Sequence, residues 1–117
     1  MIVLCTMPSD SSRRELYRVT YPLVERPTFE VGRYLHEIVD CSERGMRYEV
    51  RDRRLPAVGT EVGGTIQFRR GASVPVSGEV IRAANDTVVL QLNPALPFSE
   101  ILAEQRYLRS KGYTLKD

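Results

Sequence analysis

The chain carries the sequence DCSERGMRYEVR at residues 40–51. Asp, Ser and Gly near its start favour turns, so we predict that the chain reverses between Asp40 and Gly45. From residue 46 onward, apolar and charged residues alternate. This period of two is typical of a strand with one buried face and one solvated face. The stretch therefore predicts a turn followed by a half-buried strand.

Similar strand signals lie on both sides of this stretch. Upstream, residues 29–40 are rich in β-branched and aromatic types, which predicts the first strand. Downstream, apolar residues alternate with polar ones in three runs, at residues 65–70, 74–83 and 88–92. Asn85-Asp86 predicts a hairpin turn between the last two runs. Glycines and prolines between residues 56 and 64 predict a break in the chain before residue 65.

The period changes near the C-terminus. Residues 97–111 carry apolar side chains at helical spacing, with Pro97 suited to the first turn and Gly112 to the end. Strands at hairpin spacing with no intervening helices favour an antiparallel barrel or sandwich. We predict one domain at residues 13–112, preceded by a flexible arm at residues 1–12 and followed by a tail at residues 113–117.

Positive charge in this chain comes almost entirely from arginine. Lys111 and Lys116 are the two lysines among 17 basic residues, and the net charge is +2. Arginine binds phosphate oxygens and guanine edges through two parallel hydrogen bonds. The small net charge excludes a protein coated with cations, so nucleic acid is not the expected partner.

Cysteine usage and hydropathy indicate the compartment. Cys5 and Cys41 are too few for a disulfide framework and predict thiols in a reducing environment. No stretch is long enough to span a membrane, and the apolar run at residues 1–7 is too short for a secretion signal. We expect a cytoplasmic protein without membrane insertion.

We find no constellation of residues suited to catalysis. His36 is the single histidine and lies in the middle of a predicted strand. One histidine and two distant cysteines cannot supply a metal site, and a Cys41–His36 pair lacks a third group. We therefore predict a strand role for His36, no enzyme activity, no metal and no cofactor.

Two spaced motifs stand out. The first, Arg14-x-x-x-Arg18, is weak by itself because a second pair, Arg47 and Arg51, has the same spacing. The second, Asp40-x-Ser42-x-x-Gly45, is more specific, since about 0.03 matches are expected by chance in a chain of this composition.

Together, in this order and with these neighbours, the motifs resemble the PilZ domain family over residues 13 to about 110. The resemblance implies a mainly β fold, a small antiparallel six-stranded Greek-key-like barrel with a C-terminal amphipathic helix. It also implies binding of cyclic di-GMP, a ligand with two guanines and two anionic phosphodiesters.

The resemblance assigns ligand contacts to motif residues. Arg14 and Arg18 would bind guanine edges and phosphates, because an arginine fork matches the O6 and N7 acceptors. Asp40 would accept hydrogen bonds from guanine N–H groups on the opposite edge. Ser42 would offer a hydroxyl, and Gly45 would permit a positive φ and a close approach of the ligand.

Two further arginines are candidates for the ligand site. In the family, an arginine at the position of Arg13 accompanies a ligand bound as a stacked pair. Arg82 lies where members place a residue that stacks on a guanine face. The alternative role for both is a solvated charge.

The expected function is a receptor or adaptor whose N-terminal arginine loop changes conformation on binding and signals to an unidentified downstream protein. We expect a monomer or a homodimer. Two other interpretations stay open: a PilZ-type module for protein–protein contact with weak or no nucleotide binding, and a small β-barrel that binds RNA through arginine and tyrosine.

Overall fold

The computed structural model describes residues 18–51 and 54–113. The elements in these residues are β1 (Val19–Thr20), η1 (Leu23–Glu25), β2 (Thr28–Val31), β3 (Tyr34–Cys41), β4 (Gly45–Glu49), β5 (Glu61–Gln67), β6 (Ser73–Ala84), β7 (Thr87–Leu92) and α2 (Phe98–Ser110). Residues 1–12 of the predicted arm and residues 114–117 of the predicted tail lie outside the described residues.

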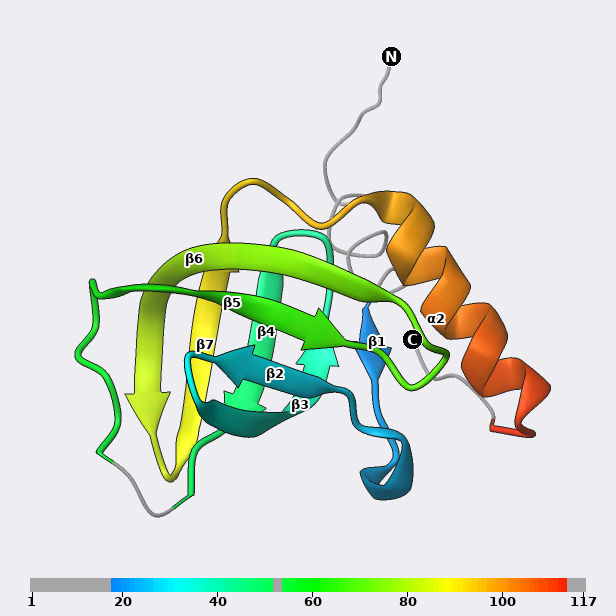
Figure 1. The fold of residues 1–117 in the computed structure, drawn as a ribbon, viewed down its shortest axis with the longest axis horizontal. Coiled ribbons are helices and arrows are strands. Elements are labelled where there is room, and N and C mark those ends of the chain that lie inside the picture. The colour runs from blue at the N-terminus through cyan, green and yellow to red at the C-terminus, as the bar shows by residue number, and fades with distance from the viewer. Residues whose placement is uncertain (1–17, 52–53, 114–117) are drawn as a thin grey trace, which may run out of the picture.

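The strands close into a barrel. Their hydrogen-bonded order is β1-β3-β2-β5-β6-β7-β4. A further pairing of β3 with β4 closes a ring that consists of the six strands β2 to β7. All pairings are antiparallel, and two meanders, β2-β3-β4 and β5-β6-β7, are joined between β4 and β5 (Figure 1). The predicted six-stranded barrel with a C-terminal helix is confirmed.

Residues 29–40 form parts of two strands, so the prediction of one strand there was wrong. β2 and β3 pair as a hairpin in which Val31 lies opposite Tyr34. Gly32, with φ of 60°, allows the tight reversal. The uniform run of strand-forming residues on both sides concealed this turn.

The predicted break at Gly63 and Gly64 was also wrong, because both glycines lie inside β5. A Cβ atom at Gly64 would collide with the backbone carbonyl oxygen of Glu30 on β2. Glycine here permits close approach of two backbones rather than a turn.

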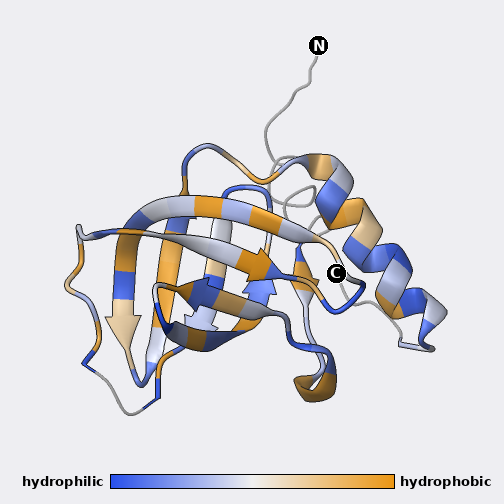
Figure 2. Ribbon diagram, in the orientation of Figure 1, coloured by the Kyte–Doolittle hydropathy of each residue, from blue (hydrophilic) through white to orange (hydrophobic). Residues whose placement is uncertain are grey.

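The other turn predictions hold. Ser42 donates its backbone N–H to Gly45 at 2.8 Å, which closes the reversal between β3 and β4. Asn85 and Asp86 have φ of 53° and 63° in the two-residue turn between β6 and β7. Figure 2 shows the expected alternation of apolar and polar residues along β6.

Helix α2 packs on the barrel, as its apolar stripe predicts (Figure 1). Ile101 and Leu108 are fully buried against the core. The carboxylate of Glu104, 1% exposed, accepts a hydrogen bond from the Tyr21 hydroxyl at 2.6 Å and another from Arg70 Nε at 2.6 Å. The helix is therefore attached to the barrel by apolar packing and by a buried polar network.

Candidate functional site

A row of side chains crosses the outer face of the barrel. The strand register places Thr20 opposite Asp40, Asp40 opposite Arg47, Arg47 opposite Val89, and Val89 opposite Arg82. Directly opposed residues lie about 4.5–5.5 Å apart at Cβ. The row therefore joins five strands whose residues are up to 69 positions apart in the sequence. We call these five residues the cross-strand row.

Two β-bulges turn charged residues of this row outward. In β3 the register shifts between Ile38 and Asp40, and in β6 it shifts between Val80 and Arg82. Ile38 and Val80 are fully buried, so strict alternation would point Asp40 and Arg82 into the core as well. One extra residue in each strand reverses that direction, a role that bulges often have beside functional sites.

Strand β1 brings the first motif beside the second. Because Val19 lies opposite Cys41, the preceding Arg18 lies level with Ser42. Arg18 is exposed, and its charge acts on Asp40 to lower the pKa of that carboxyl. Arg13 and Arg14 lie outside the described residues.

Within the residues that the structure describes, Asp40 makes one ion pair. Its carboxylate oxygen Oδ2 lies 3.4 Å from Arg47 Nε, and its side chain is 14% exposed. Burial raises the pKa of Asp40, while the charges of Arg47 and Arg18 oppose that rise in pKa. A hydrogen-bond donor from a ligand would stabilise the charged form of such a carboxylate.

Comparisons with known proteins identify the family and the fold. The family model for the PilZ domain matches residues 12–109. The chain belongs to the PilZ domain family. A crystal structure of an uncharacterised Legionella protein aligns with a TM-score of 0.59 and 19% identity, covering 80% of this chain and 95% of that one, which supports the same fold. No curated protein matches the chain. PilZ domains are in general cyclic di-GMP-binding modules rather than enzymes.

The residues of the second PilZ motif form the turn between β3 and β4. The Ser42 hydroxyl lies 3.5 Å from the backbone oxygen of Gly45, a weak contact that leaves the hydroxyl open to a ligand. Gly45 is not among the glycines with positive φ, so the conformational reason expected for it was wrong. A Cβ atom there would make ordinary contacts at 3.5 Å or more.

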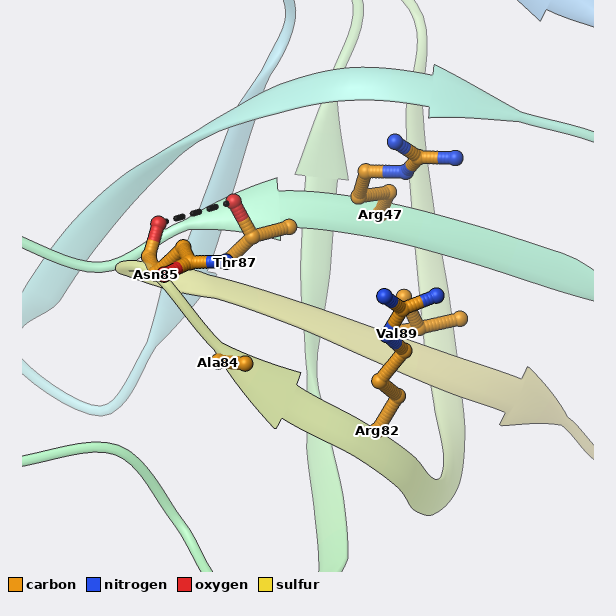
Figure 3. Close-up of a pocket in the computed structure, with 6 residues that line it drawn as sticks. All are labelled: Arg47, Arg82, Ala84, Asn85, Thr87 and Val89. Atoms are coloured by element: carbon orange, nitrogen blue, oxygen red, sulfur yellow. Dashed lines mark hydrogen bonds between the residues drawn. The ribbon is translucent and has the colours of Figure 1, made fainter.

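The far end of the cross-strand row borders an open hollow of about 170 Å³. Its lining residues are Arg47, Arg82, Ala84, Asn85, Thr87 and Val89 (Figure 3). Pockets that enclose a drug-sized ligand measure roughly 300–1,000 Å³, so this hollow would seat one part of a dinucleotide. Arg82, predicted from the sequence, is thus joined to Asp40 by a continuous surface.

Arg47 is the charged member of the row that the sequence motifs of this PilZ domain did not indicate. The Arg47–Arg51 spacing was attributed to chance, and Arg47 was assigned to the wet face of its strand. The sequence held one signal for Arg47, its position two residues after Gly45 at the start of the strand that follows the turn. A residue there can face the same side of the sheet as Asp40 on the preceding strand, and the structure pairs the two.

The chemistry considered for Cys41 does not fit its surroundings. The thiol is buried and lies 3.6 Å from the Tyr21 hydroxyl, and burial raises its pKa to about 12. A protonated, enclosed thiol is a poor nucleophile. His36 lies in β3 as predicted, 8% exposed, with its ring centroid 5.2 Å from that of Tyr48.

No group of three or more potential metal ligands occurs within residues 18–51 and 54–113. None of the helices in that part of the chain is long and apolar enough to cross a membrane.

Proposed function

We propose that this PilZ domain is a receptor for cyclic di-GMP that binds the ligand on the outer face of β3, β4, β7 and β6. One observation carries the proposal: β1 pairs with β3, so Arg18 of the first motif lies beside Asp40 and Ser42 of the second. Motif halves 22 residues apart are thereby neighbours on one surface.

Each motif residue has a chemical role in this proposal. Asp40 accepts hydrogen bonds from guanine N1–H and the 2-amino group, which an arginine cannot do. Arg18, with Arg14, binds the guanine O6 and N7 edge and the phosphodiesters. Ser42 and Gly45 contact the ligand at the turn.

Two other arginines extend the proposed site. Arg82 stacks on a guanine face from the far end of the cross-strand row, where it borders the hollow. Arg13 favours two stacked ligand molecules over one, so the stoichiometry tests its role.

Signal transfer is the second half of the proposal. Binding would draw the arginine loop onto the barrel, and helix α2 would present the altered surface to a downstream protein. The β3–β4 turn supports this route, since the Glu43 carbonyl accepts the Leu96 N–H at 2.7 Å and the Arg44 carbonyl accepts the Leu92 N–H at 2.8 Å. These bonds connect the proposed ligand turn to the segment that leads into α2. We propose a cytoplasmic location, where this second messenger acts.

Calorimetric titration with cyclic di-GMP tests the receptor function, with GTP and cyclic di-AMP as controls. We expect saturable binding of cyclic di-GMP alone, and a ratio of one or two ligands per chain. Arg14→Ala and Arg18→Ala should each weaken binding while the melting temperature of the free protein stays nearly unchanged. Absence of binding by the wild-type chain would refute the receptor function and favour a protein-contact module.

A further inference from the structure

Asp40 is already occupied in the free protein. Its carboxylate pairs with Arg47 at 3.4 Å, and Arg47 itself is well exposed, with 44% of its side chain accessible. The guanine N–H groups assigned to Asp40 would need the same carboxylate oxygens. A ligand must therefore share Asp40 with Arg47 or displace it.

Arg47 has a second place to go. It stands between Asp40 on one side and Val89 on the other, one strand spacing from each. Figure 3 shows Arg82 extending from β6 across Val89, while Arg47 on β4 extends away from both. Val89 and Ala84 are apolar residues that line the hollow together with these two arginines.

The apolar part of the hollow suits the face of a purine. A planar base gains from apolar contact with Val89, whereas a phosphate would leave that apolar surface unused. An arginine fork at the edge of such a base matches the O6 and N7 acceptors of guanine. The two guanines of one ligand can then use the two ends of the row.

We propose that Arg47 is a specificity-determining residue that exchanges partners. It covers the carboxylate of Asp40 in the free protein and, when cyclic di-GMP gives one guanine to Asp40, it binds the O6/N7 edge of the second guanine above Val89. This inference rests on the proposed receptor function.

Affinity measurements on three variants test the exchange. Arg47→Ala should weaken cyclic di-GMP binding about tenfold, the cost of one bidentate base contact. Arg47→Lys retains the charge beside Asp40 but loses the fork, so it should not restore binding. Arg51→Ala is the matched control, because it removes an exposed arginine of the same chain segment. Arg51 lies four residues after Arg47 and pairs with Glu49 at 3.0 Å. This control variant should bind like the wild type.

Cyclic di-IMP separates the two ends of the row. It keeps the O6 and N7 acceptors but lacks the 2-amino donor, so Arg47→Ala should weaken its binding by the same factor as for cyclic di-GMP. Asp40→Asn should weaken its binding by a smaller factor than for cyclic di-GMP.

The outcomes are distinguishable. If the wild type binds cyclic di-GMP and Arg47→Ala binds as tightly as Arg51→Ala, the inference is overturned and the receptor function stands. Restoration of affinity by Arg47→Lys would likewise overturn it, since a charge alone would then suffice. If the wild type does not bind, the receptor function fails first.

Discussion

Two carboxylates in this domain have a pKa raised by burial, yet they have different partners. Glu104 of α2 is 1% exposed, and two donors, the Tyr21 hydroxyl and Arg70 Nε, each lie at 2.6 Å. Asp40 is 14% exposed, and Arg47 at 3.4 Å is its one ion-pair partner within residues 18–51 and 54–113. Each oxygen of the first carboxylate accepts a hydrogen bond from the fold, while the second keeps capacity for a ligand.

The difference separates a structural carboxylate from one that we propose to bind the ligand. Burial alone does not do so, because desolvation is the largest cause of the raised pKa at both residues. The number and closeness of the hydrogen-bond donors distinguish the two carboxylates. A buried acceptor contributes to the stability of the fold when the fold itself supplies its hydrogen-bond partners. Substitutions at the two sites should therefore act on different properties.

The largest expected effect is on stability at Glu104. Glu104→Ala removes both hydrogen bonds and leaves Arg70 and the Tyr21 hydroxyl without their buried acceptor, so the free energy of unfolding should fall by about 3–5 kcal/mol. Urea denaturation measures this loss. Glu100→Ala is the control, because Glu100 also pairs with Arg70 but is 26% exposed and should cost less than about 1 kcal/mol. Equal losses for the two variants would contradict a structural role specific to Glu104.

Asp40→Asn should reverse this pattern. Cyclic di-GMP affinity should fall by about 1.5–3 kcal/mol, the range for hydrogen bonds to a charged group. Stability should change little or rise, since a raised folded-state pKa means that the charged form is less favourable in the fold than in the unfolded chain at neutral pH. Calorimetry and urea denaturation of one sample measure both. A loss of stability as large as that of Glu104→Ala would make Asp40 structural.

Several parts of the fold could be predicted from the sequence. The alternation after Gly45, the Asn85-Asp86 turn and the helical period before Ser110 each follow from local residue patterns, and the structure contains all three. The spacing of Asp40, Ser42 and Gly45, with the arginine pair, was enough to indicate the family.

The rest depends on long-range register, which local patterns do not encode. The bulge before Arg82 is needed because Val80 and Ala83 both pack toward the core, and only the pairing of β6 with β7 reveals it. The closeness of Arg47 to Asp40 likewise follows from the shifted pairing of β3 with β4. Gly64 was misread as a chain break because the backbone of β2 that it contacts lies 34 residues earlier.

Tyr21→Phe tests the buried network with a smaller change. It removes the hydroxyl that donates to Glu104 and leaves the ring in the core, so we expect a loss of about 1 kcal/mol in the free energy of unfolding. Cyclic di-GMP affinity should be unchanged within error if the network serves the fold alone. Weaker binding by a variant that remains fully folded would show instead that the two carboxylate regions are coupled.

The smallest expected effect is a pH dependence of binding at Asp40. Protonation removes the acceptor that guanine needs, so affinity should fall as the pH is lowered. Because burial raises the pKa of Asp40 above its ordinary 3.8, this fall should begin at a higher pH than an exposed aspartate would give. We expect this loss of affinity on acidification to be smaller than that caused by Asp40→Asn, because at neutral pH the wild-type carboxylate still accepts hydrogen bonds. Arg18 and Arg47 both oppose the rise in pKa, so Arg47→Ala should move the fall to still higher pH. Asp40→Asn provides the reference curve of affinity against pH. A wild-type curve parallel to that reference would show that Asp40 does not cause the pH dependence.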